Sequence, residues 1–257
     1  MERTCARAVE MGLPAVAFAE HADHTAWQVP AGELDESLTA FITHDGLLTP
    51  PGLDLDGYLA CVQRCRERFP ELRIISGVEL GEPHLHGAVV AELLDAGRFD
   101  RVLGSLHCLP VGRRSTEVAS LYRHRPAPDV LREYLAEVSR LVSDSDAFAV
   151  LAHIDYAIRD WPAYAGPFDP DAFADDFRHA LGLLAAGGRT LEVNTRVPFH
   201  PQIVRWWREE GGTTITFGSD AHDPTALARG FGDAALMVEA HGFRPGRHPW
   251  DLWTRPG

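Results

Sequence analysis

Short apolar segments alternate along the chain with longer amphipathic ones. The apolar segments are rich in β-branched residues and occupy 15–21, 73–81, 101–107, 148–155, 190–195 and 213–220. Helix-period patterns, several of them closed by glycine, cover 54–69, 87–97, 128–142, 170–188, 200–212 and 224–242. Apolar strands that alternate with helices predict a parallel sheet covered by helices. No linker or repeat divides the pattern, so we expect a single domain over residues 1–257.

The chain opens on a charged amphipathic helix rather than on a strand. This segment, MERTCARAVEMG, ends at Gly12 just before the first apolar segment. In a strict alternation of strand and helix, each helix follows a strand. The opening helix therefore lacks the strand that should precede it.

Composition excludes several classes of function. The net charge is −13, and all 24 basic residues are arginine, so no lysine is present for Schiff-base or P-loop chemistry. The acidic balance disfavours binding to long nucleic acid. No apolar run is long enough to cross a membrane, and the four cysteines form no CxxC pair, so we expect a cytoplasmic protein with reduced thiols.

Ionisable residues follow the predicted strands at the same end. They are His21, Glu79, His107, His153, Asp220 and His222. One such residue after a strand usually caps a helix or binds a loop. Polar groups at the same end of six successive strands, with Asn194 at the end of the strand at 190–195, are not explained by capping. Because the carboxyl ends of parallel strands converge at one mouth, these side chains predict a metal centre. Imidazole and carboxylate ligands suit zinc, manganese or iron, and their number indicates two or three divalent ions.

The ordered set of motifs resembles the PHP (polymerase and histidinol phosphatase) superfamily and is most similar to its histidinol-phosphate phosphatases. The motifs are FAEHAD, GVELGEPHLH, GSLHCLP, LAHIDYAIRDWP, LEVNTR and FGSDAHDP. The resemblance implies a distorted (β/α)7 barrel with up to three metals at its carboxyl mouth. It also implies that the six residues named above are ligands, with Glu79 bridging two ions.

The His-x-His strand that opens this family has no counterpart here. Either the chain begins at an internal methionine of a longer product, or it lacks one of the family's metal positions. In both cases we expect the strand around Ala15–Ala19 to be exposed along one edge.

The resemblance predicts hydrolysis of a small phosphomonoester, histidinol phosphate above all. Arg159 and Arg196 match positions that contact the substrate phosphate, and Asp220 or His222 is placed to protonate the leaving alkoxide. Two alternatives stay open. One is a PHP phosphoesterase or nuclease acting on nucleotides or other small phosphate esters. The other is a metal-binding protein without turnover. The oligomeric state is not indicated.

Overall fold

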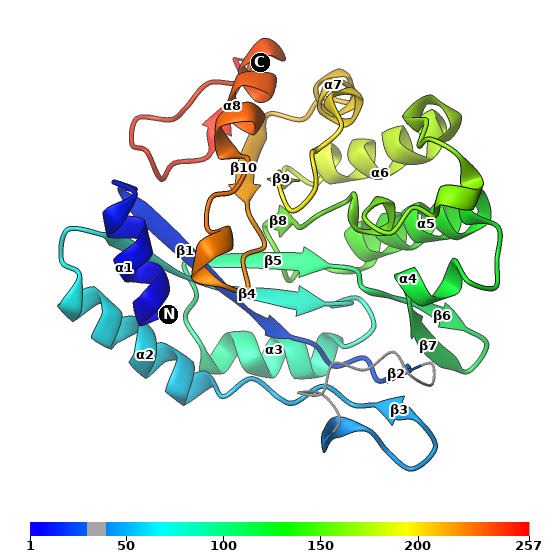
Figure 1. Ribbon diagram of the computed structural model, residues 1–257, viewed down its shortest axis with the longest axis horizontal. Coiled ribbons are helices and arrows are strands. Elements are labelled where there is room, and N and C mark those ends of the chain that lie inside the picture. Colours follow the sequence, from blue (N-terminus) through cyan, green and yellow to red (C-terminus); the bar gives the residue numbers. More distant parts are fainter. Residues whose placement is uncertain (30–39, 257) are drawn as a thin grey trace.

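The computed structural model describes residues 1–29 and 40–256 and contains two sheets. The larger sheet has the strand order β1-β4-β5-β8-β9-β10-β11 and curls into an open half-barrel (Figure 1). Its strands are β1 (Ala15–Ala22), β4 (Arg73–Gly81), β5 (Arg101–Ser105), β8 (Val150–Leu151), β9 (Thr190–Asn194), β10 (Thr214–Gly218) and β11 (Trp253–Thr254). The first six correspond to the six predicted strands and run parallel, which confirms the α/β prediction.

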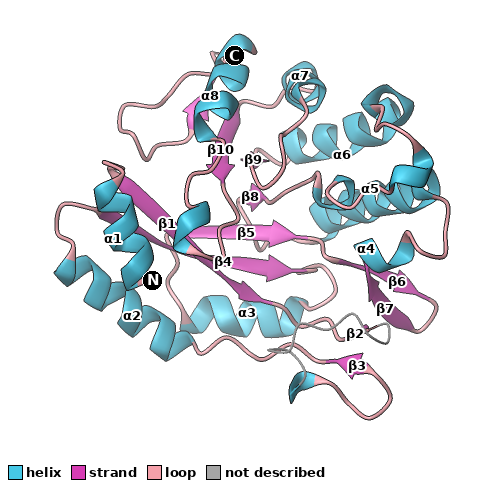
Figure 2. Ribbon diagram, in the orientation of Figure 1, coloured by secondary structure: helices cyan, strands magenta, loops and turns pink. Residues whose placement is uncertain are grey.

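Helices cover the outside of this sheet (Figure 2). They are α1 (Glu2–Glu10), α2 (Leu55–Arg68), α3 (Gly87–Ala96), α5 (Ala127–Asp144), α6 (Ala174–Ala186), α7 (Pro201–Glu209) and α8 (Phe231–Ala240). The short helix α4 (Val118–Leu121) instead lies beside the smaller sheet described below (Figure 2). Local sequence fixes several helix starts: the Asp54 carboxylate accepts from the Gly57 N–H (3.0 Å) ahead of α2, and Pro128 lies in the first turn of α5. No described helix is long and apolar enough to pass through a bilayer.

The apolar core explains why the central strands form continuous hydrophobic runs in the sequence. The main cluster packs α5, α6 and α7 against β8, β9 and β10 and includes the fully buried Trp207 and Phe177. A second cluster packs α1 and α2 against β1 and β4. Strand β4 is buried along almost its whole length because β1 and β5 pair with its two edges and residues of α2 and α3 pack against its apolar side chains. The core thus holds the carboxyl ends of the strands in fixed register.

Strand β1 lies at one end of the strand order, with β4 as its partner among the described residues. Within Ala15–Ala19, Ala17 is exposed, and the described residues add no strand beyond β1, which agrees with the expected open edge. At the other end, β11 pairs with β10 in the antiparallel direction, where Ile215 lies opposite Trp253. This antiparallel strand was not predicted, because two residues are too short to show a period.

A second sheet lies near the carboxyl ends of the barrel strands. Its order is β3-β2-β7-β6, with β2 (Trp27–Gln28), β3 (Leu47–Leu48), β6 (Cys108–Val111) and β7 (Arg114–Glu117). The sequence pattern did not predict it. The predicted strand at 148–155 is also shorter than expected, because the chain leaves the sheet after Leu151 and turns at His153.

Candidate metal centre

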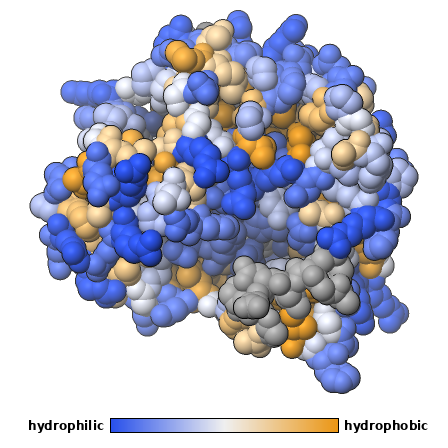
Figure 3. Space-filling view, viewed as in Figure 1, coloured by the Kyte–Doolittle hydropathy of each residue, from blue (hydrophilic) through white to orange (hydrophobic). Residues whose placement is uncertain are grey.

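The six predicted ligands converge on one mouth of the half-barrel. His21 and Glu79 lie opposite each other in the register of β1 and β4. His107 and His153 follow β5 and β8, and Asp220 follows β10. His21, His107, His153, Asp220 and His222 line a cavity of about 620 Å³, and Arg159 and Arg196 line it as well. Glu79 lies just behind this wall, in contact with His107 and His153. Hydrophilic residues predominate across the face of the molecule seen in Figure 3.

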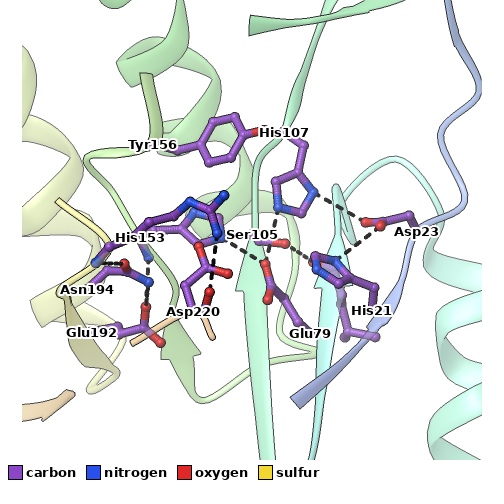
Figure 4. A network of polar contacts seen from close by, with 12 residues as sticks. His21, Asp23, Glu79, Ser105, His107, His153, Tyr156, Glu192, Asn194 and Asp220 are labelled. Atoms are coloured by element: carbon purple, nitrogen blue, oxygen red, sulfur yellow. Dashed lines mark hydrogen bonds and ion pairs between the residues drawn. The ribbon is translucent and has the colours of Figure 1, made fainter. Parts of the chain in front are cut away.

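His107 lies between two carboxylates (Figure 4). Its Nδ1 is 3.3 Å from Asp23 Oδ1, and its Nε2 is 3.2 Å from Glu79 Oε1. Glu79 Oε1 is also 2.8 Å from His153 Nε2, and Asp23 Oδ2 is 3.2 Å from His21 Nδ1. A continuous row of imidazole and carboxylate groups therefore crosses the mouth, from His21 to His153.

This row contains two groups of side chains whose donor atoms fit a metal ion. The groups are His21, Asp23 and His107, and Glu79, His107 and His153; within each, the donor atoms lie within 4.8 Å of one another. Nitrogen donors mixed with carboxylate oxygens are the set that zinc, manganese and iron prefer. The donor chemistry thus fits the divalent ions that the sequence predicts.

Asp220 and His222 belong to neither group. Asp220 Oδ2 is paired with Arg159 Nη1 at 2.6 Å, and Asp220 Oδ1 is 3.5 Å from His222 Nε2. The backbone of Asp220 has a positive φ of 50°, an uncommon conformation for a residue other than glycine. Such strain is found mainly at functional sites, where the surrounding structure imposes it.

Electrostatic contacts keep the carboxylates of the row ionised. Burial alone would raise the pKa of Glu79, but His153 and His107 outweigh burial and hold that pKa well below its usual range. In the same way His107 and His21 lower the pKa of Asp23 against the effect of burial. The hydrogen bond to Asp23 raises the pKa of His21 to about 8. The carboxylates of the row therefore carry negative charge. Imidazolium groups balance this charge in the metal-free protein, and a bound cation can balance it in their place.

Both predicted arginines lie at the cavity, in different environments. The Arg159 side chain is only 9% exposed, and its Nε and Nη2 have no hydrogen-bond partner within residues 1–29 and 40–256. Arg196 is exposed, and its Nη1 donates to the Asp220 carbonyl at 3.3 Å. Arg159 thus holds unused donors beside the row, while Arg196 lies closer to the opening.

Comparison with known proteins identifies the family. The PHP domain family matches residues 1–196. The chain belongs to this family.

Curated relatives of this PHP domain carry one name. The probable histidinol-phosphatase of Deinococcus radiodurans is 28% identical over 87% of this chain and 90% of the relative. The histidinol-phosphatase of Lactococcus lactis is 25% identical over 67% of this chain and 68% of its own length.

A solved structure has the same fold. It is the histidinol phosphate phosphatase of Lactococcus lactis subsp. lactis in complex with zinc, L-histidinol and phosphate. Its TM-score is 0.75 at 21% identity, over 94% of this chain and 87% of the solved one.

Sequence reasoning missed Asp23, which the PHP domain places directly between two histidines. A usable signal was present in FAEHAD, because residues two apart on a strand point to the same face, and Asp23 follows His21 by two. Sequence reasoning also missed Tyr156, whose ring lies 5.1 Å from that of His107 and 5.2 Å from that of His153. Nothing in the local pattern distinguishes this tyrosine from a packing residue.

Buried polar residues contact the backbone of the predicted ligand His153. Glu192 is buried, and burial raises the pKa of its carboxyl. Its Oε1 accepts from Asn194 Nδ2 at 2.7 Å and lies 3.4 Å from the His153 N–H. A Cβ on Gly218 would lie 2.5 Å from Glu192 Oε2, so only glycine leaves room for this carboxyl group. Such contacts fix the backbone from which His153, a predicted ligand, projects.

Proposed function

We propose that this chain is a metal-dependent phosphomonoesterase whose substrate is histidinol phosphate. The observation that carries the proposal is the row from His21 to His153 beside Arg159, whose Nε and Nη2 have no hydrogen-bond partner among the described residues. A carboxylate–imidazole row suits cations, and a guanidinium suits a phosphate oxygen through parallel charge-assisted bonds. The names of the curated relatives and the zinc, L-histidinol and phosphate held by the Lactococcus protein support the same substrate.

The metal ligands proposed are His21, Asp23, Glu79, His107 and His153, with Asp220 and His222 at the edge of the set. Two or three divalent ions, zinc, manganese or iron, suit them. Bound there, such ions polarise a phosphoryl oxygen and lower the pKa of water toward 7. Asp23 and Glu79, kept ionised by their histidine partners, hold negative charge at the positions that the ions need.

Arg159 is proposed to hold the substrate phosphate. Its Nη1 remains paired with the Asp220 carboxylate, which fixes the guanidinium plane. Nε and Nη2 can then donate to phosphate oxygens. Arg196, nearer the opening, adds a second positive charge. His222 has a side chain that is 67% exposed at the cavity and a contact with Asp220, so it is suited to deliver a proton to the departing alkoxide.

Another part of the cavity wall suits a cationic group. Two acidic residues, Glu117 and Asp160, line it. The Tyr156 hydroxyl donates to Glu117 Oε1 at 3.0 Å, and the Arg159 guanidinium lies 5.1 Å from the Tyr156 ring. Tyr156 therefore lies between the proposed phosphate site and a carboxylate. A phosphate ester with an ammonium or imidazolium at its far end, as in histidinol phosphate, complements this arrangement.

A substrate panel tests the proposal. Chelator-treated protein is supplied with manganese or zinc, and phosphate release is measured from histidinol phosphate, nucleoside monophosphates and short oligonucleotides. We expect metal-dependent release, with the highest kcat/KM for histidinol phosphate. A higher kcat/KM for nucleotides would assign the chain to the alternative phosphoesterase or nuclease class. Bound metal without release from any substrate would leave the hypothesis of a metal-binding protein without turnover.

A further inference from the structure

Glu82 occupies a strained position directly after β4. Its backbone φ is 45°, in the left-handed region, although it is not a glycine. The residue is 1% exposed, and it lines the same cavity as the ligand row. A non-glycine residue is held in this conformation only when surrounding contacts impose it. The contacts of Glu82 therefore indicate why its backbone is held in this conformation.

Both the backbone and the side chain of Glu82 are bonded to the end of β5. Its backbone N–H donates to the Ser105 carbonyl at 2.9 Å. Its Oε1 accepts from the backbone N–H of His107 at 2.6 Å and of Cys108 at 3.0 Å. Bonds from two amides to one carboxylate oxygen are charge-assisted and stronger than neutral ones. The carboxylate therefore fixes the backbone on both sides of the His107 side chain.

We propose that Glu82 is a positioning residue for His107, an inference that rests on the proposed metal centre. His107 belongs to both groups of metal-competent side chains and faces a carboxylate through each ring nitrogen. A small rotation of its backbone would move both nitrogens away from Asp23 and Glu79 together. By accepting hydrogen bonds from the two amides, Glu82 sets the direction in which the His107 imidazole projects from the backbone. Outer groups that orient a ligand typically contribute 10- to 100-fold to metal affinity.

The same loop provides a matched control. Glu137 on α5 is also buried, and its Oε1 lies 2.8 Å from Nε2 of His84, two residues after Glu82. Both of these side chains are 3% exposed, and neither lines the cavity. Removing Glu137 therefore disturbs a buried polar contact of the loop without releasing the amide of His107. A purely structural role for Glu82 would make the two glutamates equivalent.

The test compares Glu82→Ala, Glu82→Asp, Glu82→Gln and Glu137→Asp. Amide hydrogen exchange of the segment that contains His107 and Cys108 is measured in chelator-treated protein, and zinc affinity is measured by competition with a chromophoric chelator. We expect Glu82→Ala and Glu82→Asp to speed exchange of this segment at least tenfold and to weaken zinc binding 10- to 100-fold. Glu82→Gln keeps an acceptor oxygen at the same reach and should stay within about threefold of the unmodified protein.

Glu137→Asp should leave both measurements unchanged, even where it lowers the unfolding temperature. Unaltered exchange and zinc affinity in Glu82→Asp, or an equal loss in Glu137→Asp, would overturn the proposal. If Glu82→Ala does not fold, the contrast between Glu82→Asp and Glu82→Gln decides the same question. Failure of the unmodified protein to bind zinc would refute the proposed function instead, whereas amide exchange would still report whether Glu82 holds the His107 backbone.

Discussion

Asp23 is packed directly against the backbone of Gly81. A Cβ at position 81 would lie 2.0 Å from Asp23 Oδ1, closer than any real contact. The Asp23 carboxylate reaches His107 and His21 because β4 carries no side chain at this point. Glycine here is therefore a requirement of the ligand row, although Gly81 supplies no donor itself.

The change Gly81→Ala should displace Asp23 and weaken the group formed by His21, Asp23 and His107. We expect at least tenfold weaker binding of one zinc equivalent, measured by chelator competition, with a smaller effect on the group around Glu79. Gly232→Ala in α8 is the control, because a Cβ added there would have nothing within 4 Å and alanine favours a helix. Equal zinc affinity in Gly81→Ala and the unmodified protein would show that Asp23 is not a ligand.

Stability of the metal-free protein should fall as pH rises through about 8. The contact with Asp23 raises the pKa of His21 to about 8, above its ordinary value of 6.5. A group whose pKa is raised on folding stabilises the folded state fully below its unfolded pKa and loses that contribution as pH rises through the folded one. Urea unfolding in chelator between pH 6 and 9 should show this decline, and His21→Gln should make it shallower. A free energy of unfolding that increases over this range would contradict the assignment.

Zinc binding should have the opposite dependence on pH. His21 must lose its proton before its nitrogen can bind a metal ion, so affinity should rise as pH increases from 6.5 through 8. Competition titrations at fixed ionic strength measure this directly. A constant affinity across the same range would indicate that His21 is not among the ligands.

Replacing Arg159 should weaken phosphate binding more than it alters the metal centre. Arg159→Ala removes the two unused donors, so we expect the inhibition constant of inorganic phosphate and the KM for histidinol phosphate to rise 10- to 100-fold. Arg159→Lys should recover only part of this, because an ammonium cannot form two parallel bonds. Arg205→Ala, which removes an exposed partner of Glu209, is the control. Unchanged phosphate inhibition in Arg159→Ala would exclude the proposed role.

Glu117 should affect substrates according to their charge. Glu117→Gln keeps a group that can accept from Tyr156 but removes the negative charge at the cavity wall. The kcat/KM for histidinol phosphate should fall at least tenfold, while that for an aryl phosphate without a cationic group should change less than threefold. Asp129→Asn, an exposed change on α5, serves as the control. A loss of equal size for both substrates would indicate a structural role for Glu117.

The parallel sheet and most of the ligand row follow from local rules. The alternation of apolar and amphipathic segments predicts six parallel strands, and the polar groups after them predict that His21, Glu79, His107 and His153 meet, because parallel strands end on one side. The register of β1 against β4, which brings His21 beside Glu79, depends on tertiary packing and cannot be read from either segment alone.

Contacts between separate loops could not be predicted from the sequence. The pairing of Arg159 with Asp220 joins residues 61 positions apart, and the bond from Glu82 to the His107 amide depends on a strained turn. The small second sheet is built from strands of two to four residues, too short for a hydrophobic period. Such features become visible only when the chain is folded.

Diffraction from zinc-soaked crystals at the zinc absorption edge tests the central claim most directly. The account predicts anomalous peaks at the mouth of the half-barrel, with ions about 2.0–2.2 Å from donor atoms of His107, Glu79, His153 and Asp23. In His107→Ala, which removes the member shared by both groups, at least one peak should disappear. Anomalous peaks only at surface histidines, or no peak at the row between Asp23 and His153, would contradict the proposed metal centre.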